Sequence, residues 1–179
     1  MTRTSKKSKN NKKCKLVLGI DPGLASTGYG VVERSGSRLR AVKTGCIKTK
    51  ASQSLAARLL LIYNEISEVI EETSPDAVAL ERIFFSKNVS SAFSVGQALG
   101  VCLLRASQAD VPVFQYSPNE VKQAVSGYGK ASKHQVQKMV AALLGAIDLP
   151  VSDHVSDALA VAICHINRAG NLLERLSDK

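Results

Sequence analysis

The chain has 179 residues, of which 45% are hydrophobic, and its formal net charge is +9. This length is typical of one domain with a sizeable core, and the composition excludes general disorder. No apolar run reaches membrane-spanning length, and the start of the chain lacks the apolar centre of a signal peptide. We therefore expect a cytoplasmic protein with no membrane partner.

The positive charge is concentrated at the N-terminus. Residues 1–15 hold seven of the 24 basic side chains and no acidic one. A solvated arm is the simplest interpretation of such a segment, and contact with phosphates is the functional one. We expect a basic disordered tail over residues 1–14, a folded domain over residues 15–170 and a C-terminal tail over residues 171–179.

The cysteines give little support to a metal or redox site. Cys14, Cys46, Cys102 and Cys164 are far apart and form no Cys-x-x-Cys pair. Free thiols suit a reducing compartment. Cys102 and Cys164 lie in apolar helical patterns, which predicts that they are small core residues.

The predicted elements begin with three strands and then alternate. Strands are predicted over residues 15–20, 29–33, 38–49 (interrupted near Gly45), 77–81 and 111–116. Helices are predicted over residues 52–73, 91–107, 119–125 and 133–144, with a last helix after Pro150 capped by Ser152 or Asp153. This order predicts an α/β fold, a mixed five-stranded sheet with helices on both faces.

Small residues recur along the predicted helix 91–107. Ala92, Gly96 and Gly100 allow another helix to approach closely. That contact lies either within the core or across a dimer, and the pattern alone leaves both open.

Asp21 ends the first predicted strand and begins a turn that carries Pro22, Gly23 and Gly28. One interpretation is a turn aspartate that bonds its own backbone. The other is a metal-binding or catalytic carboxylate. Actin, Hsp70 and sugar kinases also use an Asp-x-Gly turn, to hold a nucleotide phosphate. The turn alone does not distinguish these interpretations, so the test is whether the rest of the chain supplies acids that could accompany Asp21.

Glu81, His154 and Asp157 are the candidates to accompany Asp21. Glu81 also ends an apolar strand, and His154 and Asp157 lie at i and i+3 on the last helix and so share a face. Neighbouring strands would bring the carboxylates to one sheet edge, where they would repel unless a cation lies among them. Oxygen ligands without thiolates suit Mg²⁺ or Mn²⁺, and two such ions can cleave a phosphodiester.

Each of these residues also has an ordinary interpretation. Glu81 could pair with Arg82, His154 could be a capping or surface histidine, and Asp153 is expected to be an N-cap or solvated.

Three blocks of the chain resemble the RuvC family of bacterial Holliday junction resolvases, from about residue 16 to residue 168. They are Gly19-Ile-Asp-Pro-Gly23 with Thr27-Gly-Tyr-Gly30, Leu80-Glu-Arg-Ile-Phe-Phe85 with Lys87-Asn88, and Ser156-Asp-Ala-Leu-Ala-Val-Ala-Ile-Cys-His165. The resemblance implies an RNase H-like fold and a homodimer with one active site per subunit. It implies Mg²⁺-dependent nicking of two strands of like polarity in a four-way junction, with ligatable 5′-phosphate and 3′-hydroxyl ends. RuvA and RuvB, the branch-migration complex, are the implied partners.

The resemblance also implies roles for particular residues. Asp21, Glu81 and Asp157 fall on the catalytic acids, and His154 falls on a fourth ligand position that is often aspartate. Asp153 is one residue out of register with that position. Together the four would hold two Mg²⁺ ions, with Mn²⁺ able to substitute.

Three further residues fall on positions that the family uses to contact DNA. Phe84 would stack on junction bases, unless it is a core phenylalanine. Lys122 and Lys133 would lie near the scissile strand, unless they are solvated helix lysines.

A structure-selective DNA endonuclease is the function that we expect. An RNase H-like nuclease acting on RNA or on another DNA structure is the alternative. An Asp-x-Gly phosphotransferase needs two such domains and a second phosphate loop, which the chain lacks. A non-catalytic DNA-binding module would not need acids at Asp21, Glu81 and Asp157.

Overall fold

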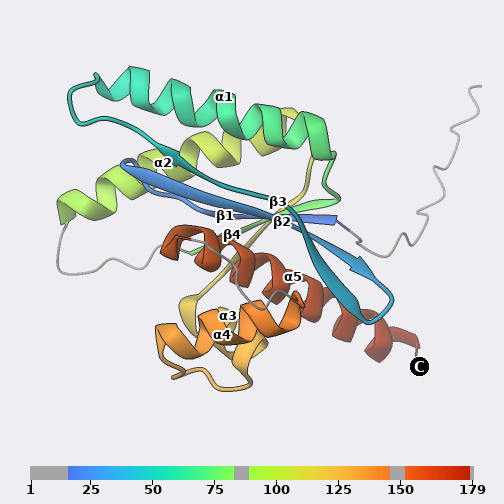
Figure 1. Cartoon of the computed structure of the whole chain (residues 1–179). Coiled ribbons are helices and arrows are strands. Elements are labelled where there is room, and N and C mark those ends of the chain that lie inside the picture. Colours follow the sequence, from blue (N-terminus) through green and yellow to red (C-terminus); the bar gives the residue numbers. More distant parts are fainter. Residues whose placement is uncertain (1–15, 83–88, 146–151, 178–179) are drawn as a thin grey trace, which may run out of the picture.

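The structure is a computed structural model that describes residues 16–82, 89–145 and 152–177, without the side chains of residues 89–91 and 170–177 (Figure 1). Its strands are β1 (Leu16–Asp21), β2 (Ser26–Ser35), β3 (Arg38–Lys48), β4 (Ala77–Glu81) and β5 (Val113–Tyr116). Its helices are α1 (Leu55–Thr73), α2 (Val89–Gln108), α3 (Pro118–Ser126), α4 (Lys133–Leu143) and α5 (Asp153–Ser177). The basic segment over residues 1–15 lies outside the described residues, so the predicted tail stays a prediction.

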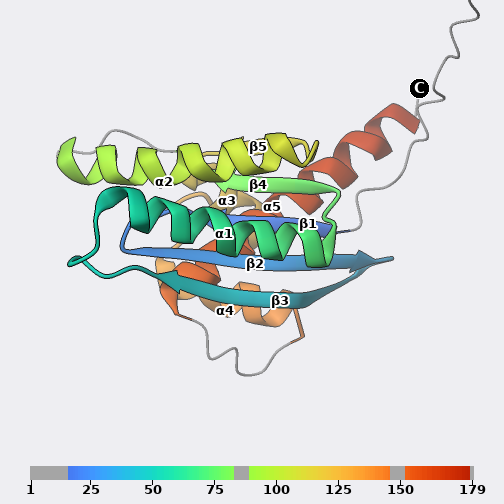
Figure 2. The same cartoon turned by 90° about the horizontal axis from the view of Figure 1, so that it is seen from above.

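The five strands form one mixed sheet in the order β3-β2-β1-β4-β5, as Figure 2 shows. Strands β1, β2 and β3 are antiparallel neighbours, whereas β4 pairs in parallel with both β1 and β5. Helices α1 and α2 cover one face, and α5 covers the other with α3 and α4 beyond it (Figure 1). The predicted α/β architecture is therefore confirmed.

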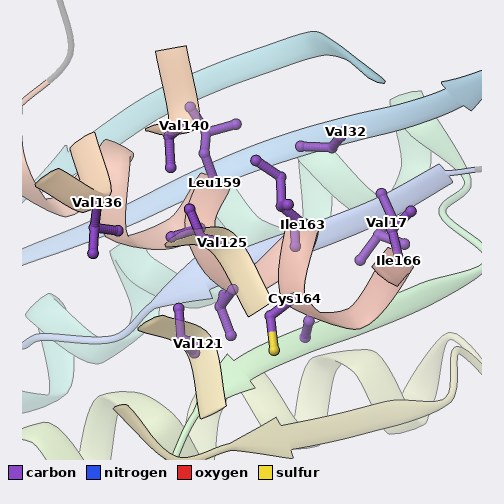
Figure 3. Packing of buried hydrophobic residues seen from close by; sticks show 14 of the residues in the cluster. Val17, Val32, Val121, Val125, Val136, Val140, Leu159, Ile163, Cys164 and Ile166 are labelled. Carbon is purple, nitrogen blue, oxygen red and sulfur yellow. The ribbon is translucent and has the colours of Figure 1, made fainter. Parts of the chain in front are cut away.

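The central strands contribute to a core on each face of the sheet, because successive residues of a strand point to opposite sides. Leu18 and Ile20 pack in the cluster under α1 and α2. Val17 packs in the cluster around α5. Figure 3 shows this second cluster, whose labelled members are Val17, Val32, Val121, Val125, Val136, Val140, Leu159, Ile163, Cys164 and Ile166. Cys102 and Cys164 are buried, as predicted.

Glycines in β1 and β2 let α5 lie directly on the sheet. A Cβ built at Gly19 would lie 2.9 Å from the Cβ of Ala162 and would collide with the carbonyl of Ala158. A Cβ at Gly28 would collide with the backbone of His154. The glycines of the first sequence block thus bring the start of α5 against the end of β1.

The predicted interruption near Gly45 is wrong. Strand β3 is continuous from Arg38 to Lys48, and the irregularity of its pairing with β2 lies between Val31 and Val32. Gly45 is a glycine for another reason, since a Cβ there would collide with the ring of Tyr29. The residue makes room for a side chain of the neighbouring strand.

Serine caps set the starts of several helices. The Ser54 hydroxyl accepts a bond from the Ala57 N–H, so α1 begins at Leu55 rather than at residue 52. Ser117 and Ser132 form capping boxes that begin α3 and α4. The carbonyl of Ser152 accepts hydrogen bonds from the N–H groups of Val155 and Ser156. Of the two predicted caps, Ser152 is therefore the residue at the N-cap position, directly before the first residue of α5, Asp153.

Within the described part of the chain, no helix combines the length and apolar character needed to cross a membrane.

Candidate active site

Asp21 and Glu81 lie side by side at one edge of the sheet. Strands β1 and β4 are parallel neighbours, with Ile20 paired to Leu80. Asp21 and Glu81 are the next residue of each strand, so both carboxylates emerge at the same end of the sheet. The predicted juxtaposition of these two acids is present.

His154 joins this edge from the first turn of α5. Its Nδ1 lies 2.7 Å from Oδ2 of Asp21. The contact depends on Gly28, which pairs with Asp21 across β1 and β2 and leaves space for the His154 backbone. The close packing of α5 on two glycine-containing strands therefore holds the imidazole against the carboxylate.

Asp157, one turn further along α5, completes the group electrostatically. The pKa of Glu81 is raised to about 7, first by burial and then by the negative charges of Asp21 and Asp157. The pKa of Asp21 is also raised, first by burial and in part by the charge of Asp157, although its bond to His154 opposes this. Three half-buried carboxylates therefore repel one another at this edge, and a cation among them would relieve the repulsion.

The donor set fits a hard divalent cation in its chemistry. It offers carboxylate oxygens and one imidazole, and no thiolate, which suits Mg²⁺ or Mn²⁺. Among residues 16–82, 89–145 and 152–177, no three histidine, cysteine, aspartate or glutamate side chains are yet arranged to hold an ion. In this arrangement Asp21 bonds His154, and Asp157 bonds Lys133.

Lys133 is brought to the site by the start of α4. The capping box of Ser132 places Lys133 at the first position of this helix. The Lys133 Nζ lies 3.2 Å from Oδ2 of Asp157 and 3.1 Å from Oδ2 of Asp153. Asp153 is exposed and points toward α4, where its Oδ1 accepts a bond from Gln137 Nε2 at 2.9 Å.

Sequence reasoning missed the link between α4 and α5. The spacing shows only that Lys133 and Gln137 share one face of their helix and that Asp153 and Asp157 share one face of theirs. Nothing in the sequence indicates that these two faces meet.

A pocket of about 220 Å³ lies beside the carboxylates. Glu81 and Asp157 line one part of it, Lys122 and Lys133 contribute two cations, and valines from α3, α4 and α5 form its apolar walls. A pocket with carboxylates and ammonium groups can accept a phosphate whose charge is shared between metal and lysine. Phe84, the predicted base-stacking residue, lies outside the described residues.

This sheet order, with acids at the ends of its two central parallel strands and on the helix packed across them, defines an RNase H-like nuclease. Comparison with known proteins gives the family. A family model described as "Crossover junction endodeoxyribonuclease RuvC" matches residues 17–165. The chain belongs to the RuvC family.

Individual relatives agree with this assignment. The crossover junction endodeoxyribonuclease RuvC of Desulfitobacterium hafniense is 51% identical over 161 residues, which cover 90% of this chain and 97% of that protein. The structure of T. thermophilus RuvC in complex with Holliday junction substrate superimposes with a TM-score of 0.83 at 38% identity, covering 87% of this chain and 94% of that one. The yeast mitochondrial Holliday junction resolvase, at 14% identity and a TM-score of 0.66, shares the fold, with 90% of this chain and 81% of that chain covered.

Proposed function

We propose that the chain is a Holliday junction resolvase, a crossover junction endodeoxyribonuclease that nicks two strands of like polarity in a four-way junction. The observation that carries the proposal is the meeting of Asp21, Glu81 and Asp157 at one sheet edge, in a chain of the RuvC family. The products would carry 5′-phosphate and 3′-hydroxyl ends that a ligase can join. RuvA and RuvB, the branch-migration complex, are the protein partners that this function implies.

The proposed catalytic residues are Asp21, Glu81, His154 and Asp157, which would hold two Mg²⁺ ions. When bound, such ions activate a water for in-line attack and stabilise the leaving oxygen, and Mn²⁺ can take the same place. Asp21 accepts a hydrogen bond from the Nδ1–H of His154, which leaves the lone pair of Nε2 free to bind a cation. Partial burial of Asp21 and Glu81 reduces the contact of their carboxylates with water and strengthens their attraction for a cation.

Lys122 and Lys133 are the proposed phosphate contacts. Both line the pocket next to Glu81 and Asp157, where an ammonium can bind a non-bridging phosphate oxygen. Phe84 remains the proposed stacking residue for a junction base, on the resemblance alone.

A homodimer would supply the second active site. On α2, Phe93 is 69% exposed and Leu104 is 55% exposed. A Cβ at Gly96 or Gly100 would meet no atom within 4 Å, so these glycines do not serve a helix contact in the core. Of the two uses left open for the small residues of this helix, contact across a dimer is the one that these positions support.

The test compares substrates under one set of conditions. The purified full-length chain is incubated with Mg²⁺ and an end-labelled four-way junction, a linear duplex of the same sequence, or an RNA–DNA hybrid. We expect paired nicks in the junction only, and repair of both nicks by DNA ligase. Cleavage of the hybrid in preference to the junction would support the alternative RNase H-like activity instead.

A further inference from the structure

Two helices meet beside the proposed metal site through four side chains. Lys133 and Gln137 lie one turn apart on α4, and they face Asp153 and Asp157, which lie one turn apart on α5. The Lys133 ammonium bonds both carboxylates, at 3.1 Å to Asp153 and 3.2 Å to Asp157. Only Asp157 belongs to the proposed metal site, so one cation is shared between a ligand and a residue outside the site.

The contacts of Asp153 hold it in place for this purpose. Its Oδ2 receives Lys133, while its Oδ1 accepts a bond from Gln137 Nε2 at 2.9 Å. Asp153 is thus oriented by α4 on both of its oxygens.

An ordinary surface ion pair is the competing explanation. The side chains of Lys133 and Asp153 are 52% and 67% exposed, and such pairs add little to stability. Asp157 distinguishes this case, because it lines the same pocket as Glu81 and lies one turn from His154, which bonds Asp21. A positive charge at Asp157 therefore relieves repulsion among three carboxylates, which is the electrostatic role of a divalent cation at the same place.

The ammonium and a metal ion compete for Asp157. Two cations within about 4 Å repel each other even in water. A divalent ion that takes Asp157 thus weakens its bond to Lys133, but it leaves Asp153, one turn earlier on α5, as a second partner for the ammonium.

We propose that Lys133 is an internal counter-ion of Asp157 that a divalent cation displaces, and that Asp153 retains the displaced ammonium beside the site. Asp153 is then a positioning residue that acts through Lys133. Retention by Asp153 makes the displacement of Lys133 from Asp157 less costly and keeps Lys133 at the pocket that it lines with Glu81. This inference rests on the proposed function, because it requires a metal at Asp157.

The first measurement is a titration of the full-length chain with Mn²⁺ in the absence of DNA. The electron paramagnetic resonance signal of free Mn²⁺ reports how much ion remains unbound. Lys133→Met should tighten binding by about five-fold, the change that corresponds to loss of one exposed ion pair. The matched control is Lys130→Met, which removes the same charge from an exposed lysine of the preceding turn. The control should change the affinity by less than about two-fold.

The second measurement tests whether Asp153 affects metal binding through Lys133 or directly through its own charge. Asp153→Asn leaves Lys133 to Asp157 alone and should weaken Mn²⁺ binding by about three-fold in the wild-type background. The same substitution in Lys133→Met should have a clearly smaller effect, because the residue through which it acts is gone. The midpoint of thermal unfolding should be the same for each variant as for the wild type, which would show that these exposed substitutions leave the fold intact.

Equal effects of Asp153→Asn in the two backgrounds would overturn the positioning role. Equal effects of Lys133→Met and Lys130→Met would overturn the counter-ion role while leaving the proposed function standing, provided that Asp157→Asn abolishes Mn²⁺ binding. Saturable Mn²⁺ binding that survives Asp157→Asn, or no saturable binding at all, would instead overturn the metal site and this inference with it.

Discussion

A hydrogen bond between His154 and Asp21 joins two of the proposed metal ligands, and it links the first strand to the last helix. A carboxylate that accepts from one imidazole nitrogen fixes the ring and leaves the other nitrogen as a ligand. The histidine therefore depends on Asp21 for its orientation, and Asp21 depends on His154 for relief of the pKa rise that burial causes.

Substitution of His154 tests whether the ring is a ligand. His154→Asp should retain substantial cleavage, because a carboxylate can take the same position, whereas His154→Ala should reduce cleavage by about 10- to 100-fold. Since imidazole is a softer ligand than carboxylate, Mn²⁺ should support at least as much cleavage as Mg²⁺ in the wild-type chain. Initial cleavage rates of a labelled junction provide the measurement, and full activity of His154→Ala would make the residue a surface histidine.

Glu81 makes the stability of the metal-free protein depend on pH. Its pKa rises from 4.5 to about 7 on folding, first through burial and then through Asp21 and Asp157. Between these two values the folded chain binds more protons than the unfolded chain, so the free energy of unfolding falls as pH rises through this window. Glu81→Gln removes this dependence.

The Glu81→Gln variant should therefore be more stable than the wild type above about pH 7, by about 1 kcal/mol after allowance for partial exposure to solvent. The difference should shrink as pH falls through the window and be smallest near pH 4.5. Thermal unfolding in the presence of a chelator at about pH 5 and about pH 8, on either side of the raised pKa, measures both values. A difference that is the same at the two pH values would show that Glu81 carries no such shift.

At the scale of residues, the sequence indicated that Asp21 and Glu81 are candidate site residues, but it did not indicate which side chains bond the acids of the site. Asp21 and Glu81 could be placed together only on the condition that their strands are neighbours, because each residue ends a buried strand. The bonds of Lys133 could not be predicted, because they depend on how α4 and α5 pack, and helical spacing says nothing about which faces meet.

At the scale of elements, α5 is the helix on which the site depends. It lies close enough to β1 and β2 that glycine is required at Gly19 and Gly28. Strand and helix positions followed from apolar periodicity, whereas the capping boxes of Ser117 and Ser132 that begin α3 and α4 were not predicted. The error at Gly45 has a clear cause, since a glycine that accommodates the ring of Tyr29 has the same sequence signature as one that ends a strand.

The exposed face of α2 is the proposed contact between the two subunits of a homodimer. Leu104→Glu would place a charge in the proposed dimer contact and should raise the dimer dissociation constant by at least about 10-fold. Met139→Glu on α4, a comparably large apolar side chain that is 37% exposed, is the matched control and should leave the dimer intact. Sedimentation velocity at micromolar concentration distinguishes the two, and a dimer that survives Leu104→Glu would exclude this face of α2.

At the scale of the whole molecule, the charge is divided between a nearly neutral body and a strongly basic N-terminal segment. The folded domain carries the acids and the pocket, so cleavage should not require this segment. Its function, if it contacts DNA, is to add affinity that does not depend on sequence.

Deletion of residues 1–14 should therefore leave junction cleavage intact and make DNA binding less sensitive to salt. The slope of log affinity against log salt should become shallower by about 0.9 for each phosphate that the segment neutralises in the full-length chain. Binding titrations of the full and shortened chains at several salt concentrations give the two slopes. Identical slopes would mean that the segment does not contact DNA.

The central claim is that Asp21, Glu81 and Asp157 form the nuclease centre of this fold, and one paired assay tests it most directly. Asp21→Asn, Glu81→Gln and Asp157→Asn are each assayed for binding to a four-way junction by gel shift and for cleavage of the same junction with Mg²⁺. Each variant should bind the junction at least as well as the wild type, because removing an acid removes repulsion of phosphates, and should no longer cleave it. Near-normal cleavage by any one of the three variants would contradict the claim for that residue.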